Sequence, residues 1–180
     1  IRSFLYLCVI VALTGVSGAG KSSVAEELSR RGYRIIRIEE LLDGAREGYD
    51  EGSGSEVVDV ERVNNNLLSL AVKDCVIEGH LAHELDVDVV IVLRARPEII
   101  EKRLRERGYG EEKVAENAEA EAIDVITIEA LEKGEEVYEI DGSDMDLSTI
   151  ADSIEQIMKG NGENFRPGRI DFSSYLLERF

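Results

Sequence analysis

The chain has 180 residues and a formal net charge of -17, with 43% hydrophobic and 33% charged residues. This length and composition indicate one globular domain with a core of its own. So acidic a surface repels a phosphate backbone, which argues against binding of free nucleic acid and favours a basic partner; solubility, or a salt-rich or hot habitat, explains the acidity equally well.

The first half of the chain alternates strand patterns with helix patterns. Residues 5–13 form a continuous apolar run. Arg2 before this run imitates a secretory signal, but we interpret the run as a buried first strand. The next expected elements are helices at 22–31 and 59–73 and strands at 33–38 and 75–77. Residues 39–58 are rich in Gly, Asp, Glu and Ser and predict a partly helical, mobile excursion above the sheet.

The second half continues this alternation. Strands are expected at 87–93 and 137–140, and helices at 98–107, 111–131 and 148–160. The acidic helix at 111–131 is long enough that an interruption stays open, and Ser148 is expected to cap the last helix. The tail that follows Gly160 has little pattern. The alternation predicts an α/β fold, with a parallel sheet covered on both faces and a ligand at the carboxyl ends of its strands.

Both cysteines, Cys8 and Cys75, lie in apolar runs. We interpret them as buried free thiols rather than as a disulfide or a metal site, which fits a reducing cytoplasm. No apolar stretch of the sequence is long enough to cross a membrane.

A phosphate-binding loop follows the first strand. Residues 15–22 read GVSGAGKS and match the pattern G-x-x-x-x-G-K-[ST]. Glycines let backbone N–H groups approach phosphate oxygens, and the helix that starts near Lys21 directs its N-terminal dipole at the same anion. The residues expected to surround the phosphates of ATP are Gly15, Gly18, Ala19, Gly20, Lys21, Ser22 and Ser23. Lys21 is expected to reach the β and γ phosphates, Ser22 to hold Mg²⁺, and Ser23 to bind an α-phosphate oxygen.

A second group of candidate residues follows the strand at 75–77. Glu78 can bind magnesium through water, and His80 can orient an attacking water or transfer a proton. The alternatives are an ordinary solvated carboxylate for Glu78 and a capping or surface role for His80. His83 is interpreted as incidental.

Several arginines can stabilise the charge of a phosphoryl group in transfer. Arg103 and Arg107 lie four residues apart and share a helix face, and Arg107 precedes a Gly-Tyr-Gly break. Arg94 and Arg96 follow a strand and are expected to flank the nucleotide, whereas Arg46 could hold the phosphate of a second nucleotide. Each of them could instead be a solvated surface residue.

These motifs together resemble one family. Their order and spacing are similar to those of the adenylate kinase isoenzyme 6 family, whose members also serve as assembly ATPases of the small ribosomal subunit. The resemblance covers about residues 8–158, and the tail sequence RPGRIDFS resembles the archaeal branch. The matching segments are residues 15–23, 48–51, 59–63, 78–80, 93–94, 103–104 and 107–109.

The resemblance implies a nucleoside-monophosphate-kinase fold with a five-stranded parallel sheet and the first strand at its centre. It divides the chain into a P-loop kinase core at 1–160 and a C-terminal tail at 161–180. Within the core it implies a second-nucleotide region at 38–58 and a lid at 106–116. The implied activity is adenylate kinase (ATP and AMP giving two ADP), with Mg²⁺ and with slower ATP hydrolysis.

The resemblance also implies a partner and a place of action. The partner is the basic platform protein of the small ribosomal subunit, eleventh in the universal naming, and the setting is the small-subunit pre-ribosome in the cytoplasm. The net charge of -17 fits a basic partner. Two positions depart from the family pattern: Glu78 stands where the family often has Asp, and Arg46 lies closer to Gly-Tyr-Asp than the family's arginine does.

Two other functions stay open. One is a nucleotide-gated assembly chaperone for the basic ribosomal protein, with only incidental kinase activity; His80, as a residue that activates water, favours it. The other is a different small-molecule P-loop kinase, such as a shikimate-like kinase, for which no additional arginine cluster is found.

Overall fold

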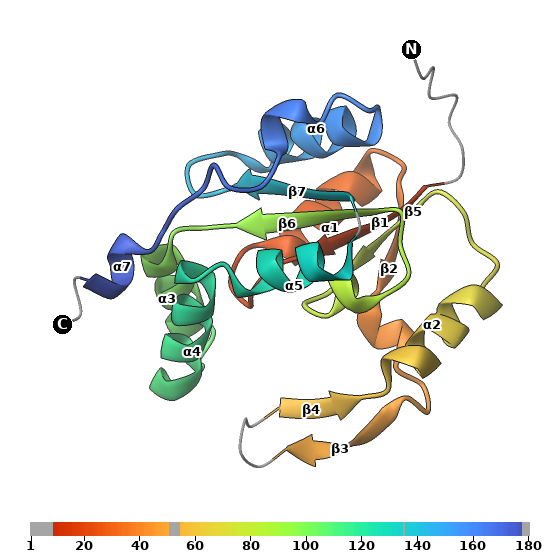
Figure 1. Ribbon diagram of the computed structural model, residues 1–180, viewed down its shortest axis with the longest axis horizontal. Helices are drawn as coiled ribbons and strands as arrows, with labels where there is room; N and C mark the ends of the chain where they lie inside the picture. Colours follow the sequence, from red (N-terminus) through yellow and green to blue (C-terminus); the bar gives the residue numbers. More distant parts are fainter. Residues whose placement is uncertain (1–8, 51–54, 135, 178–180) are drawn as a thin grey trace.

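The computed structural model describes residues 9–50, 55–134 and 136–177 (Figure 1). Within them, five parallel strands form one sheet in the order β2-β5-β1-β6-β7. This arrangement confirms the predicted α/β fold with the first strand at the centre. The strands are β1 (Ile10–Thr14), β2 (Arg34–Arg37), β5 (Cys75–Glu78), β6 (Val89–Arg94) and β7 (Glu136–Asp141).

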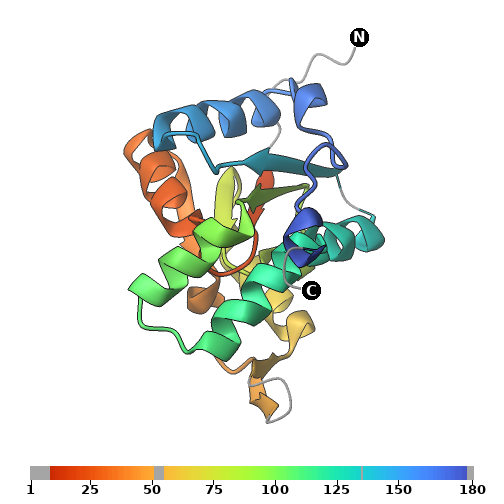
Figure 2. The same cartoon turned by 90° about the vertical axis from the view of Figure 1, so that its left-hand side faces the viewer.

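Helices cover both faces of the sheet, as Figures 1 and 2 show. Helices α3 and α4 form a pair that lies side by side at the carboxyl end of the strands (Figure 2). No helix in the described ranges combines the length and the apolar character that crossing a bilayer requires. The helices are α1 (Lys21–Arg30), α2 (Val60–Ser69), α3 (Pro97–Glu106), α4 (Glu111–Ala122), α5 (Val125–Lys133), α6 (Leu147–Met158) and α7 (Ser174–Leu177), with 3₁₀ turns η1 (Ile38–Leu41), η2 (Ala82–Glu84) and η3 (Glu163–Phe165).

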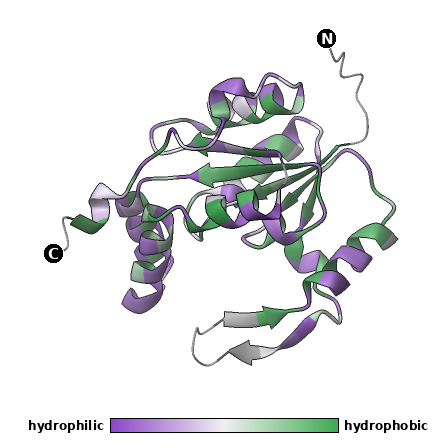
Figure 3. Cartoon of the chain, viewed as in Figure 1, coloured by the Kyte–Doolittle hydropathy of each residue, from purple (hydrophilic) through white to green (hydrophobic). Residues whose placement is uncertain are grey.

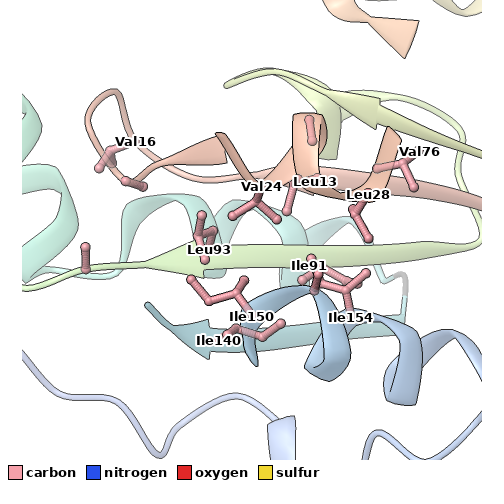
Figure 4. Close-up of a cluster of buried hydrophobic side chains, with 14 of the residues drawn as sticks. Leu13, Val16, Val24, Leu28, Val76, Ile91, Leu93, Ile140, Ile150 and Ile154 are labelled. Atoms are coloured by element: carbon pink, nitrogen blue, oxygen red, sulfur yellow. The ribbon is translucent and has the colours of Figure 1, made fainter. Parts of the chain in front are cut away.

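The hydrophobic core lies on the two faces of the sheet. Successive side chains of a strand point to opposite faces, so Leu13 of β1 packs on one face and Ala12 on the other. On the first face, Val24 and Leu28 of α1 meet Ile154 of α6 and the strand residues, as Figure 4 shows. The central strands are hydrophobic along most of their length, whereas α3 and α4 show long hydrophilic stretches (Figure 3). Each such buried Leu, Ile or Val side chain stabilises the fold by roughly 1.5–3 kcal/mol.

The excursion at 39–58 differs from the prediction. After η1 it forms a hairpin of β3 (Arg46–Asp50) and β4 (Ser55–Val58), antiparallel and with an irregularity between Arg46 and Gly48. Among the described residues of this excursion, the helical part is one 3₁₀ turn. The segment at 51–54 lies outside the described residues, as do residues 5–8 of the predicted first strand and Cys8. Cys75 is a buried free thiol, as predicted.

The positions of two helix boundaries became clear only from the structure. The predicted helix at 111–131 is interrupted at Asp124, whose φ of 58° places it in the left-handed region and separates α4 from α5. Ser148 does not cap the last helix. Asp146 does, because its carboxylate accepts a hydrogen bond of 2.8 Å from the backbone N–H of Thr149, and an ionised carboxylate is a strong cap.

The tail after Gly160 packs against the core. The backbone N–H of Gly168 donates to a carboxylate oxygen of Glu139 in β7 at 3.0 Å. The guanidinium of Arg166 lies 4.7 Å from the centre of the Tyr138 ring. Figure 1 shows the chain running from α6 across the sheet edge to α7, which lies beside the α3–α4 pair. The tail therefore contacts both β7 and α4.

Candidate active site

The loop between β1 and α1 lies at the carboxyl end of the central strand. Gly15, Gly18 and Gly20 have φ angles of 137°, 90° and 111°, which side chains with a Cβ rarely adopt. At Gly15 the space is restricted as well, since an added Cβ would lie 2.4 Å from the carbonyl oxygen of Leu93. The loop can therefore turn its N–H groups toward one point only because glycine occupies these positions.

Lys21, the first residue of α1, lies folded into this loop. Its ammonium group donates hydrogen bonds to the carbonyl oxygens of Gly15 at 2.7 Å and Val16 at 2.9 Å. Burial lowers the pKa of Lys21 to about 8, and the positive charge of Arg107 adds to this decrease. The carboxylate of Glu78 acts in the opposite direction and raises the pKa. Binding of an anion next to this buried ammonium stabilises its charged form.

Ser22 and Glu78 form a pair of oxygen donors beside the loop. The Ser22 hydroxyl donates a hydrogen bond of 3.2 Å to Oε1 of Glu78, the last residue of β5. Glu78 is 6% exposed and lies opposite Leu13 in the parallel register. Hydroxyl and carboxylate oxygens are the ligands that Mg²⁺ prefers, and so the pair is chemically suited to hold that ion.

His80 follows the end of β5 and lines the same space as Lys21. Its side chain keeps contact with solvent. Partial burial of the ring lowers the pKa of His80, and the positive charge of Lys21 lowers it further. The imidazole is therefore neutral near pH 7 and able to accept a proton.

Arg103 of α3 and Arg107, which follows this helix, both lie at the loop, as their spacing predicts. Arg103 donates from Nη1 to the carbonyl oxygens of Gly18 and Ala19, each at 3.0 Å. Arg107, the residue after α3, faces the loop from the same helix side. Arg103 therefore holds the loop backbone, and Arg107 places a positive charge beside Lys21.

The expectation that Arg94 and Arg96 flank the nucleotide is wrong. Arg94 is 1% exposed and forms ion pairs with three carboxylates, among them Glu121 at 2.6 Å. The other two carboxylates belong to Asp124 and Glu139. Arg96 pairs with Asp144 at 2.7 Å on the surface. These acidic partners come from α4, β7 and later segments, which local sequence patterns around the arginines do not reveal.

Cavities adjoin one another along this site in the described part of the chain. The loop cavity, of about 350 Å³, is lined by Lys21, Ser22, Glu78 and His80. On one side it meets the outer cavity, of about 260 Å³, with which it shares Gly20 and Arg107. On the other side it meets the hairpin cavity, of about 500 Å³. The hairpin cavity shares Ser17, Glu39, His80 and Tyr109 with the loop cavity.

The predicted site residues divide among these cavities. Ser23 lines the outer cavity together with apolar side chains, among them Met145 and Ile150. Arg46 lines the hairpin cavity, where the sequence predicts a second nucleotide. The lid predicted at 106–116 consists of the end of α3, the turn through Tyr109 and the start of α4.

Two residues at the site were not predicted. Asn117 of α4 accepts a hydrogen bond of 3.1 Å from the backbone N–H of Ser17, and no sequence pattern in that acidic helix marks it. His83, interpreted as incidental, is 2% exposed, and its Nδ1 lies 3.0 Å from the Thr14 hydroxyl at the end of β1. The sequence signal that could have marked His83 is its position as a second histidine, three residues after His80.

Comparison with known proteins gives consistent results. A family model described as an AAA domain matches residues 11–124. The chain is 44% identical over 177 residues to an Archaeoglobus fulgidus protein named "Putative adenylate kinase", covering 95% of this chain and 96% of that protein.

Among solved structures, the fold resembles that of shikimate kinase from Acinetobacter baumannii in complex with shikimate. The TM-score is 0.61 at 19% identity, covering 87% of this chain and 96% of that one. It also resembles deoxyadenosine kinase from M. mycoides, with a TM-score of 0.56 at 17% identity, covering 84% and 99% of the two chains. At this level of identity the structural likeness establishes the fold alone.

Proposed function

The chain belongs to the AAA-domain family and is a P-loop kinase related to the Archaeoglobus fulgidus protein. From this premise we propose that it transfers the γ-phosphoryl group of ATP to AMP. The products are two molecules of ADP. An oxygen of the AMP phosphate attacks the γ-phosphorus, the bond from that phosphorus to the β–γ bridging oxygen breaks, and ADP leaves with the bridging oxygen.

The observation that carries this proposal is the line of adjoining cavities. A loop built for phosphates lies in the middle, with the outer cavity on one side and the larger hairpin cavity on the other. Two nucleotides can then meet with their phosphates end to end in the loop cavity. A protein that bound only one nucleotide would need the loop cavity and the outer cavity, but not the hairpin cavity.

We assign the donor side as follows. Lys21 binds the β and γ phosphates, and the loop N–H groups from Gly18 to Ser23 surround the phosphate chain. Ser22 and Glu78 hold Mg²⁺, which when bound neutralises charge on the phosphates. Arg107 meets the charge that develops on the transferred group, and Arg103 keeps the loop backbone in position.

On the acceptor side, Arg46 of the hairpin binds the AMP phosphate. Leu42 and Ile38 give the same cavity an apolar wall suited to a base. When water replaces AMP, neutral His80 accepts its proton and slow ATP hydrolysis results.

A more specific proposal concerns the cellular role. We infer membership of the adenylate kinase isoenzyme 6 branch, and with it action on the small-subunit pre-ribosome in the cytoplasm through the basic platform protein named above. The motif set from the phosphate loop to Arg107 and the net charge of -17 support this role. The position of neutral His80 at the loop supports a second candidate, a nucleotide-gated assembly chaperone whose main reaction is hydrolysis.

The test is ADP formation from magnesium ATP, measured with and without AMP and with and without the purified basic partner. AMP-dependent formation of two ADP per ATP supports the kinase. No effect of AMP, together with partner-dependent hydrolysis, replaces it with the chaperone. Shikimate in place of AMP serves as the control for a different small-molecule kinase.

A further inference from the structure

A cluster of metal-binding side chains lies outside the nucleotide site. It consists of His83 and Glu84 of η2 and Glu129 of α5, whose donor atoms all lie within 4.8 Å of one another. His83 is 2% exposed, whereas Glu84 and Glu129 have side-chain exposures of 39% and 46%. The cluster thus has a fixed nitrogen on its inner side and two carboxylates that solvent can reach.

Thr14 contacts Nδ1 of His83, the ring nitrogen that does not face the two carboxylates. The Thr14 hydroxyl lies 3.2 Å from the carbonyl oxygen of His80 and 3.0 Å from Nδ1 of His83. In the tautomer in which the hydroxyl donates its single proton to the carbonyl, Nδ1 donates its own proton to the hydroxyl oxygen. In the neutral ring, Nε2 is left with its lone pair exposed.

This lone pair faces two other acceptors. Nε2 lies 3.1 Å from Oε2 of Glu129 and 3.4 Å from Oε1 of Glu84. In this tautomer the three acceptors repel one another unless a cation such as a metal ion lies between them; with the proton on Nε2 instead, the ring donates a hydrogen bond to Glu129.

The distances are compatible with a metal ion. The contact to Glu129, at 3.1 Å, is within the range of an ordinary N–H···O hydrogen bond, whereas the contact to Glu84, at 3.4 Å, is longer than one. Ligands about 2.0–2.1 Å from a tetrahedrally coordinated ion lie roughly 3.3–3.4 Å from one another, which is close to the spacing found. A histidine that binds a metal through one nitrogen also donates the other N–H to a neighbouring acceptor, as His83 does to Thr14.

We propose that His83, Glu84 and Glu129 bind a divalent transition-metal ion of the zinc class. Imidazole with carboxylates suits Zn²⁺, Co²⁺ or Ni²⁺, whereas Mg²⁺ prefers oxygen ligands only, so this site differs from the Ser22–Glu78 pair. The ion joins η2 to α5 and, through His83 and Thr14, holds the turn that carries His80. Lys133 lies nearby and donates to the carbonyl oxygens of Glu84 and Leu85.

The test uses the full chain, stripped of metal with a chelator and titrated calorimetrically with ZnCl₂ in the absence of nucleotide. We expect one equivalent to bind. The double variant Glu84→Gln, Glu129→Gln keeps the shape of both side chains and should bind at least tenfold more weakly. Glu132→Gln changes an exposed carboxylate on the same helix and should bind as the wild type does.

A further variant separates the two candidate metal sites. Glu78→Gln should leave zinc binding unchanged; if it removes the binding while the double variant retains it, the ion belongs to the nucleotide loop and the proposal fails. Absence of zinc binding in the wild type overturns the proposal as well.

Nitrogen-15 spectra of the histidine rings supply an independent readout. The proposal requires a neutral His83 protonated at Nδ1, whose Nε2 resonance moves when zinc is added. A doubly protonated ring that zinc does not affect would mean an ion pair with Glu129 and would overturn the proposal. Circular dichroism of each variant shows whether it is folded.

Discussion

The hydroxyl group of Tyr175 donates a hydrogen bond of 2.7 Å to Oε1 of Glu101. This bond joins α7 of the tail to α3, the helix that carries Arg103. The Tyr175 ring is 7% exposed and packs against Ala118 and Ala122 of α4. One tail residue therefore contacts both helices that bound the nucleotide loop.

Replacement of Tyr175 tests this contact. Tyr175→Ala removes a buried ring and should lower the free energy of unfolding by about 3 kcal/mol. Tyr175→Phe keeps the ring, loses only the hydrogen bond to Glu101, and should cost about 1 kcal/mol. Urea denaturation of both variants gives the two values. An unchanged stability of Tyr175→Ala would contradict the packing of the tail on α4.

The elements that the sequence predicted well are those whose pattern is local. The strand at Val89–Arg94 and the helix at Lys21–Arg30 follow from apolar runs and from periodicity within a few residues. The hairpin of β3 and β4 was not predicted, because its strands are short and polar and lack clear alternation. Its glycines and acidic residues indicated a loop instead.

At the site, the phosphate loop and Glu78 could be predicted because a motif and a strand end place them. The role of Arg94 could not be predicted. Its partners Glu121 and Glu139 lie 27 and 45 residues away in the chain, and only the folded sheet brings them to it. Asn117 contacts Ser17 across 100 residues for the same reason.

Lys21 is predicted to be essential for turnover. Lys21→Met keeps much of the length of the side chain but removes the charge that binds phosphate, so ADP formation should fall by about 100-fold or more. Lys102→Met, at an exposed position of α3, is the control and should retain activity. A Lys21→Met protein with wild-type turnover would exclude the loop as the catalytic centre. Coupled measurement of ADP release checks both.

The lowered pKa of Lys21 predicts a pH dependence. The folded, nucleotide-free protein loses this proton at about pH 8, whereas the unfolded chain holds it to about 10.5. The unfolded state thus binds more protons between these values, and the contribution of Lys21 to the free energy of unfolding rises with pH across that window. Bound phosphates favour the ammonium, so binding of ATP must restore the proton above pH 8.

Affinity for ATP should therefore fall as the pH rises, by about fivefold from pH 8 to pH 9, because about half of the Lys21 side chains have already lost the proton at pH 8. Isothermal titration at pH 7, 8 and 9 measures it. Lys21→Arg keeps its charge throughout this range and should bind ATP with an affinity that changes little. An equal decrease in both proteins would assign the effect to another group.

The burial of Arg94 predicts that it acts on stability rather than on the nucleotide. Arg94→Met leaves Glu121 and Glu139 buried without their cation and should lower the free energy of unfolding by about 3 kcal/mol. Arg96→Met breaks an exposed pair with Asp144 and should cost at most about 1 kcal/mol. Denaturation gives these values, and the KM for ATP of folded Arg94→Met should equal that of the wild type. A raised KM for ATP would indicate that Arg94 acts at the nucleotide site after all.

His80 is predicted to serve hydrolysis rather than nucleotide binding. His80→Ala removes the neutral imidazole that accepts a proton from water, so ATP hydrolysis should slow by about 100-fold while the affinity for ATP stays unchanged. Because burial and the charge of Lys21 lower the pKa of His80 below its ordinary value, the wild-type hydrolysis rate should fall at a lower pH than protonation of an unperturbed imidazole would give. Single-turnover hydrolysis as a function of pH, with ATP binding measured in parallel, separates the two effects. If His80→Ala loses binding and hydrolysis in the same proportion, the ring shapes the loop cavity instead of taking part in the reaction.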